Sequence, residues 1–194
     1  DMFYQTGKPS TGGNAIQRNF VPSYTATVMQ RLSAAGALNL GGLNMSEFAS
    51  GPVGQNLHFG DCRNPWNTAH APGGSSSGSG SAVAGRLVHG ALGSDTGGSV
   101  RIPAALCGLV GMKVTAGRIP RGPHTSIGPM TVVSGCLARS VRDAARWYDV
   151  CAGFDARDPY SLPAEADWEA GLGSTDLRGL RAVISPDLGS ATIS

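Results

Sequence analysis

Residues 73–81 read GGSSSGSGS, and this stretch limits the fold of the chain most because none of its side chains is larger than that of serine. A second glycine-rich stretch, GSDTGGSVRIPAA, follows at residues 93–105. Glycine serves either in flexible linkers or where the backbone must approach another segment closely. A linker predicts polar, charge-rich surroundings, whereas residues 82–88 read AVAGRLV. The sequence therefore favours a structured role for both stretches.

Composition excludes several classes of protein. Hydrophobic residues make up 41% of the 194 residues and charged residues 14%, which is typical of a chain with a buried core. The net charge is +2 and the basic residues are scattered, so we expect no direct nucleic-acid partner. No apolar run approaches the roughly 20 residues of a membrane span. No signal peptide is visible, and we expect a cytoplasmic protein with no membrane partner.

Cysteine and histidine spacing predicts no metal site. The four cysteines are far apart and form no C-x-x-C pair, which favours buried, reduced thiols. The four histidines form neither H-x-x-x-H nor H-E-x-x-H. We expect no metal and no cofactor.

Alternating strands and helices predict an α/β fold, with a mixed sheet covered by helices on both faces. The clearest helix lies at 140–153, where Ser140 and Asp143 resemble a capping box and Val141, Ala144, Ala145, Tyr148 and Cys151 form the apolar stripe. Helices are also predicted at 23–37 and 81–88, with a helical turn at 44–51. Strands are predicted at 38–42, 90–95, 107–114 and the start of 178–189, and loops at 63–74 and 124–130.

The glycine-serine stretch fits neither a phosphate-binding loop nor a nucleophile elbow. A phosphate-binding G-x-G-x-x-G would need a third glycine where Val83 stands, and G-x-x-x-x-G-K-[S/T] is absent. GSSSG at 74–78 matches the nucleophile elbow G-x-S-x-G with Ser76 central. That motif requires a strand directly before it, and here the preceding residues are the proline-containing NTAHAPG.

Residues 72–115 taken together resemble the amidase signature. The shared pattern is a Gly-Gly-Ser-Ser loop, a small-residue helix, a Gly-Ser-Asp-x-Gly-Gly-Ser turn, Arg-Ile-Pro-Ala and Gly-x-Lys-Pro-Thr, with Val114 in place of the usual proline. Segments 34–51, 56–67, 128–130, 138–158 and 177–189 also resemble family segments in the expected order. The resemblance implies the amidase signature fold, of which residues 1–194 form an N-terminal-to-central part of a single domain. We expect both ends to be truncated, and this piece alone to be inactive.

The resemblance implies a Ser–cis-Ser–Lys triad. Ser99 is the expected nucleophile, and Ser75, 24 positions earlier, the expected proton relay. The Gly74–Ser75 peptide bond is expected to be cis. A catalytic lysine must lose its proton to act as a base. Asp1, Gly7, Pro9, Ser10 and Thr11 match the family pattern that follows this lysine, which places it immediately before Asp1. Lys8 is expected to be a solvated surface charge, and Lys113 matches a family lysine that is not catalytic.

Further roles follow from the resemblance and from proximity in sequence. The N–H groups of Thr96, Gly97, Gly98 and Ser99 are expected to form the oxyanion hole. Asp95 and Arg101 are expected to pair and hold this turn, with a simple surface pair as the alternative. Ser76 and Ser94 are expected either to donate to the triad or to satisfy backbone groups. Met45, Phe48 and Trp66 are candidates for the substrate pocket, with core packing as the alternative. Gly42 and Leu43 replace a lysine and a threonine common in relatives.

The expected activity is hydrolysis of a non-peptide C–N bond, with a small-molecule amide, carbamate or urea-like substrate. The alternative is a glutaminase-like subunit of a tRNA-dependent amidotransferase, which feeds ammonia to a partner. Both hypotheses share the core motif, so the motif cannot separate them. The sequence also leaves a homodimer open.

Overall fold

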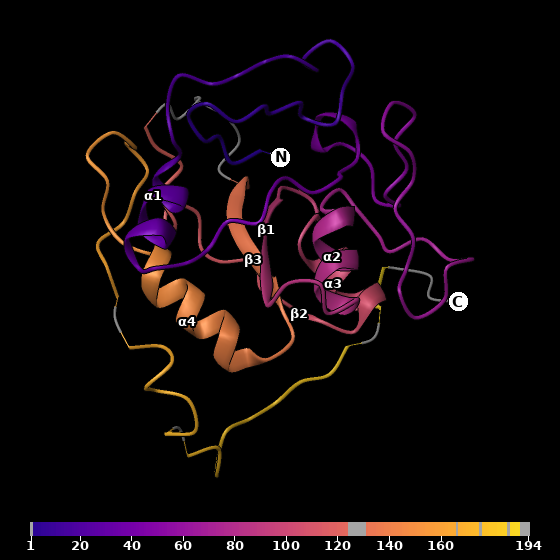
Figure 1. Ribbon diagram of the computed structural model, residues 1–194. Coiled ribbons are helices and arrows are strands. Elements are labelled where there is room, and N and C mark those ends of the chain that lie inside the picture. Colours follow the sequence, from indigo (N-terminus) through magenta and orange to yellow (C-terminus); the bar gives the residue numbers. More distant parts are fainter. Residues whose placement is uncertain (1, 124–130, 166, 175, 186, 191–194) are drawn as a thin grey trace.

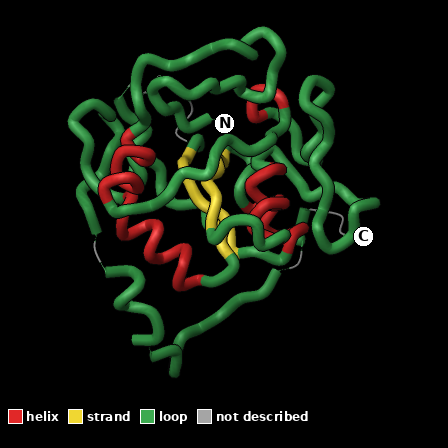
Figure 2. Tube along the Cα trace, in the orientation of Figure 1, coloured by secondary structure: helices red, strands yellow, loops and turns green. Residues whose placement is uncertain are grey.

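A small sheet lies between two pairs of helices (Figure 1). The computed structural model describes residues 2–123, 131–165, 167–174, 176–185 and 187–190. In chain order the elements are α1 (Thr27–Ala34), the 3-10 helix η1 (Glu47–Ala49), α2 (Ser77–Ala84), β1 (Gly90–Asp95), α3 (Arg101–Cys107), β2 (Val110–Gly111), β3 (Val133–Ala138) and α4 (Val141–Cys151). Figure 2 shows that long irregular segments surround this α/β centre.

β3 is the central strand of the described sheet, whose order is β1-β3-β2. It pairs antiparallel with β1 along its whole length, from Gly90 opposite Ala138 to Asp95 opposite Val133. β2 pairs antiparallel with the other edge of β3. The register places the end of β1, and the glycine-rich turn that follows it, beside the start of β3.

Helices cover both faces of this sheet, as predicted. α4 packs on β3 with α1 outside it, and their apolar side chains form one cluster around Val28, Cys136, Tyr148 and Cys151. α2 and α3 contact β1 and β2 and form a second cluster of Val83, Val100, Ala104 and Leu137. The sheet is therefore buried between two apolar layers.

The predicted helix at 140–153 is confirmed as α4, with one difference in its apolar stripe. The Ser140 hydroxyl accepts a hydrogen bond from the Asp143 N–H at 3.1 Å and donates to the Asp143 carboxylate at 2.7 Å. Ala144, Ala145, Tyr148 and Cys151 are buried, but Val141 is 57% exposed. Val141 is the first residue of the helix, so its exposure does not interrupt the buried stripe from Ala144 to Cys151.

Two other helices differ in their bounds from the prediction. The helix expected at 23–37 is shorter, and Gly36 follows it with a φ of 83°, as a C-terminal glycine does. Arg31 of this helix donates to the carbonyl groups of Cys151, Ala152, Gly153 and Phe154, which end α4. The helix expected at 81–88 instead spans Ser77–Ala84, so it both begins and ends earlier, and residues 77–81 of the glycine-serine stretch are helical rather than loop.

Three strand predictions need correction. Residues 38–42 form no strand, and Leu38 and Leu40 are mostly exposed. Residues 178–185 form none either, and Val183 and Ile184 are each 93% exposed. A strand needs a hydrogen-bonded neighbour, and neither segment has one among the described residues. The strand expected at 107–114 is only β2, because α3 extends to Cys107.

The two loop predictions have different outcomes. Residues 63–74 form a loop with one isolated bridge between Asn64 and Asn67, as expected. The loop expected at 124–130 lies outside the described residues. The turn expected at 44–51 contains the single 3-10 turn η1, inside which Phe48 has a φ of 52°.

Candidate active site

Ser75 lies in a tightly packed loop just before α2. Its side chain is 1% exposed, and its carbonyl accepts a hydrogen bond from the Ser46 N–H at 3.0 Å. The peptide bond between Gly74 and Ser75 is cis, which confirms that expectation. A Cβ at Gly74 would lie 2.5 Å from the Gly51 carbonyl oxygen, so only glycine fits there. The glycine of this loop thus serves close packing.

The loop of Ser75 meets the segment of Ser99. The Ser76 N–H donates to the Ser99 carbonyl at 3.3 Å. The loop also approaches β1 at Gly93, where an added Cβ would lie 2.8 Å from the Ser76 hydroxyl oxygen. Ser99 is half-buried and ends the turn that joins β1 to α3. The two serines predicted from the sequence therefore lie on adjacent segments.

Asp95 organises the turn that carries Ser99. Its side chain is fully buried and forms an ion pair with Arg101, with 2.9 Å between Oδ1 and Nη2. It also accepts hydrogen bonds from the N–H groups of Gly98, Val100 and Arg101. Burial by itself would raise the pKa of Asp95, but the bonds from Arg101, Val100 and Gly98 outweigh it and hold the pKa below its usual value. The carboxylate is therefore ionised at neutral pH and holds both ends of the turn.

The predicted oxyanion donors are not equivalent. The Gly98 N–H points at Asp95 Oδ1, 2.8 Å away, and is therefore engaged within the protein. In the part of the chain that the structure describes, the N–H groups of Thr96, Gly97 and Ser99 have no protein acceptor. Thr96 and Gly97 are both exposed, and an added Cβ at Gly97 would meet nothing within 4 Å. Of the four predicted donors, Thr96, Gly97 and Ser99 therefore keep an N–H group without a described protein acceptor, whereas the Gly98 N–H helps to shape the turn.

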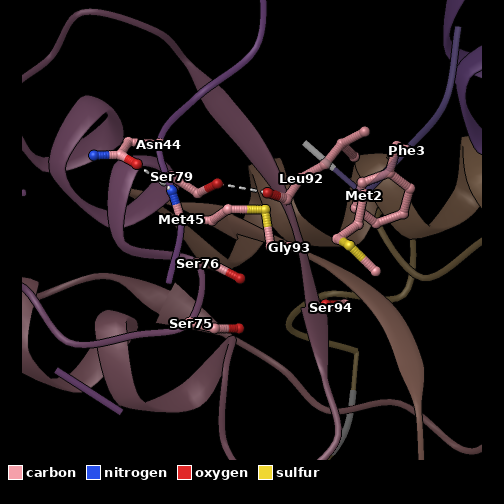
Figure 3. A pocket seen from close by; sticks show the side chains of 10 residues that line it. All are labelled: Met2, Phe3, Asn44, Met45, Ser75, Ser76, Ser79, Leu92, Gly93 and Ser94. Atoms are coloured by element: carbon pink, nitrogen blue, oxygen red, sulfur yellow. Dashed lines mark hydrogen bonds between the residues drawn. The ribbon is translucent and has the colours of Figure 1, made fainter. Parts of the chain in front are cut away.

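A small cavity of about 20 Å³ borders the Ser75 loop (Figure 3). Ser75 and Ser76 line one side, and their hydroxyl groups point toward the strand that carries Leu92 and Ser94. The remaining wall residues are Met2, Phe3, Asn44, Met45, Ser79 and Gly93. Ser76 and Ser94 are therefore both placed at this cavity, while the described hydrogen bond of Ser76 runs through its backbone.

The three candidate pocket residues lie in different places. Met45 is 5% exposed and lines the cavity next to Ser75. Phe48 is 57% exposed and lies outside it. Trp66 is 73% exposed, and its indole N–H donates to the Cys107 carbonyl at the end of α3. Only Met45 is brought to the serines, because the residues after it turn outward through η1.

A second, larger pocket of about 290 Å³ adjoins Met45. Asn44 and Met45 line both pockets. The remaining wall consists of Pro9, Thr11, Gly13, Gly42, Leu43 and Phe59. Gly42 and Leu43, which depart from the family pattern, therefore face a space close to the serines.

Neither lysine of the chain lies at the serines. Lys8 is exposed, as expected for a surface charge. The Lys113 ammonium group donates to the Val114 carbonyl at 3.1 Å, and Lys113 lines neither pocket. Met2 and Phe3, in contrast, line the cavity beside Ser75. The N-terminal segment therefore borders the cavity of Ser75.

Several wall residues were not predicted from the sequence. Ser79 follows Ser75 and Ser76 by about one helical turn, and its hydroxyl donates to the Leu92 carbonyl at 2.6 Å. Helical spacing would have placed Ser79 on the same face as Ser75 and Ser76 if the helix had been predicted to begin at Ser77. Asn44 precedes Met45 directly, but nothing in its sequence context distinguishes it.

The described residues contain neither a metal-binding group of side chains nor a membrane-spanning helix. No group of three or more His, Cys, Asp or Glu side chains within them could hold a metal ion. All four cysteines are free thiols. No helix in the described ranges has the length and apolar character needed to cross a membrane.

Known proteins resemble the chain over nearly its whole length. It is 46% identical over 93% of its residues to a glutamyl-tRNA(Gln) amidotransferase subunit of Methylococcus capsulatus, and 51% identical over 84% to the corresponding protein of Bordetella avium. It covers 37% and 32% of these two relatives, so it spans about a third of their length.

Solved structures show the same fold. One, described as a vestigial protein complex that reveals the evolutionary origins of an s-triazine catabolic enzyme, has a TM-score of 0.86 and 41% identity, covering 93% of this chain and 40% of that one. The native peptide amidase of Stenotrophomonas maltophilia has a TM-score of 0.79 and 37% identity, covering 87% of this chain and 36% of that one.

These likenesses agree with the motifs at residues 72–115 and confirm the amidase signature fold. The family model named Amidase matches residues 1–194. The match includes both glycine-rich stretches and the helix α4 that follows them. The chain therefore belongs to the amidase family.

Proposed function

We propose that the full-length protein is a cofactor-free amidohydrolase that cleaves the C–N bond of an amide, carbamate or urea-like substrate. The observation that carries this proposal is the hydrogen bond from the Ser76 N–H to the Ser99 carbonyl, which joins the segments of the two proposed catalytic serines. The buried Asp95 supports it by holding the turn that ends at Ser99.

The proposed reaction is acyl transfer in two steps. Ser99 Oγ attacks the carbonyl carbon while its proton passes through the Ser75 hydroxyl to a neutral lysine. The N–H groups of Thr96, Gly97 and Ser99 stabilise the negative oxygen of the tetrahedral intermediate. The C–N bond then breaks, and the leaving nitrogen receives the proton back through Ser75. Water next attacks the Ser99 ester and gives its proton to the lysine by the same route. The proton then returns through Ser75 to Ser99 Oγ as the acid is released.

The lysine is the one that the family pattern places immediately before Asp1. The positions of Met2 and Phe3 in the cavity wall beside Ser75 support this assignment. A lysine base must be neutral, so we expect kcat/KM to rise as the pH increases through the pKa of this group. An acid optimum would contradict a lysine base.

The nucleophile is tested in the full-length protein. Ser99→Ala is expected to lower kcat for amide hydrolysis by on the order of 10⁴-fold or more, because acylation has no alternative nucleophile. Ser81→Ala is the matched control: this serine also loses a hydroxyl, but its Oγ donates to the Arg63 carbonyl, away from the cavity. Normal turnover by Ser99→Ala would overturn the assignment. A panel of amides, carbamates and ureas measured with the wild-type protein defines the substrate.

The second candidate is a glutaminase-like subunit of a tRNA-dependent amidotransferase. It is favoured by the names of the curated relatives, which are 46% and 51% identical to this chain. A likeness of similar strength to the structure connected with s-triazine catabolism favours a small nitrogen-rich substrate instead. Hydrolysis of simple amides by the purified protein without a partner supports the first candidate. Copurification with a second subunit that is required for activity supports the second.

A further inference from the structure

The backbone of Asn44–Ser46 holds the Ser75 loop at two points. The Ser46 N–H donates to the Ser75 carbonyl at 3.0 Å, and the Asn44 carbonyl accepts from the Gly78 N–H at 2.9 Å. The two segments touch without intervening side chains, since an added Cβ at Gly78 would lie 2.5 Å from the Asn44 carbonyl oxygen. A displacement of Asn44–Ser46 would therefore move Ser75.

The side chain of Asn56 holds this segment from behind. Asn56 is 3% exposed, and its Nδ2 donates to the carbonyl of Met45 at 2.8 Å and to that of Gly13 at 2.7 Å. Its Oδ1 accepts from the N–H groups of His58 and Phe59 at 2.8 and 2.9 Å. These partners fix the orientation of the amide, because the reversed orientation would place donors against donors.

Asn56 thus connects three segments at one buried point. Both of its amide protons bind carbonyl groups, and one of these belongs to Met45, between the two residues that contact the Ser75 loop. All four partners are backbone groups, so the amide sets the position of the chain rather than of mobile side chains. An aspartate of the same shape would accept but not donate, and would leave the Met45 and Gly13 carbonyls without a partner.

We propose that Asn56 is a positioning residue for the Ser75 proton relay, acting through Met45 and Ser46. The proposal rests on the acyl-transfer function proposed above. Its consequence depends on the leaving group. An amine departs only when its nitrogen is protonated, which requires the relay, whereas a 4-nitrophenolate departs without a proton. Misplacement of Ser75 therefore impairs amide cleavage more than cleavage of an activated ester.

The experiment compares an anilide and a 4-nitrophenyl ester of the same acyl group, using the full-length protein. Active sites are counted from the initial burst of 4-nitrophenol, so that a smaller folded fraction does not alter kcat/KM per site, which reports the acylation step for both substrates. Asn56→Asp is expected to lower the ratio of anilide to ester kcat/KM by about 10-fold or more. Asn56→Ser, which is neutral but too short to reach both carbonyls, is expected to lower the same ratio.

Asn64→Asp is the matched control. Asn64 is also a buried asparagine, with 7% exposure, and its Nδ2 donates to the Leu106 carbonyl at 2.8 Å, but Leu106 lines neither pocket, whereas Met45 lines both. Its variant is expected to keep the wild-type ratio.

Equal losses on both substrates with the Asn56 variants, or no loss, would overturn the positioning role. So would the absence of titratable sites in both variants, because Asn56 would then serve folding alone. Failure of the proposed function would give different results. Ser99→Ala would then keep its turnover, and the wild-type protein would show no burst.

Discussion

At the residue scale, neighbouring glycines of one turn have different reasons to be glycine. Gly98 has a φ of 132°, and an added Cβ would lie 2.7 Å from Ile102 Cδ1. Gly97 has open space around the same position. The DTGGS motif does not distinguish the two, because the difference depends on the backbone angles and on α3, which packs against the turn.

This contrast predicts different effects on stability. Gly98→Ala is expected to lower the free energy of unfolding of the full-length protein by about 2 kcal/mol, because a side chain is strained at this φ. Gly97→Ala is expected to change it by less than about 0.5 kcal/mol, because the added methyl group meets no neighbour. Urea unfolding of both variants measures the difference. Equal destabilisation would show that the turn differs from the one described.

At the element scale, α4 was predictable because its signals are local. The Ser140 cap, the apolar stripe and the terminal glycine all lie within one segment, and the helix forms where they indicate. β3 shows the opposite case. All six of its residues are buried, so it lacks the polar alternation of a half-exposed strand, and it was not predicted.

The cap of α4 gives the prediction at this scale. Ser140→Ala is expected to lower the free energy of unfolding by about 1 kcal/mol, because the Asp143 N–H loses its acceptor at the helix start. Ser140→Thr keeps the hydroxyl group and is expected to retain most of this stability. The measurement is thermal unfolding of both variants, and an unchanged midpoint for Ser140→Ala would mean that the cap contributes nothing.

At the scale of the whole molecule, Asp155 ties together parts of the chain that are distant in sequence. Its carboxylate accepts from the Arg157 side chain and from the Thr27 hydroxyl, at the start of α1. The Arg157 guanidinium is the main reason why the pKa of Asp155 lies well below its usual value, despite burial. Asp158 extends the network by accepting from the Arg121 N–H.

This network predicts a pH-dependent stability. A carboxyl whose pKa is lowered by folding contributes stability that is complete above its unfolded pKa of about 3.9 and is lost as the pH falls toward the folded value. Asp155→Asn is therefore expected to lower the urea midpoint clearly at pH 6 and by a smaller amount at pH 3, where the contribution of the carboxylate has begun to fall. Asp176→Asn is the control, because Asp176 forms the same pair with Arg178 but both side chains are exposed. A pH-independent effect of Asp155→Asn would contradict this role.

The candidate site divides in the same way. The sequence by itself determined the family, the two serine segments and the pairing of Asp95 with Arg101, because each depends on a motif or on residues close together in the chain. Only the tertiary structure decided which candidates surround Ser75: Met45 lies beside it, while Phe48 and Trp66 face outward. It likewise decided that the Gly98 N–H donates to Asp95 and that the Asn56 side chain donates to the Met45 carbonyl. The physical reason is that these features arise only when the helices pack against the sheet. Segments then approach each other closely at glycines, side chains become buried, and hydrogen bonds form between distant segments. No local sequence pattern encodes these contacts.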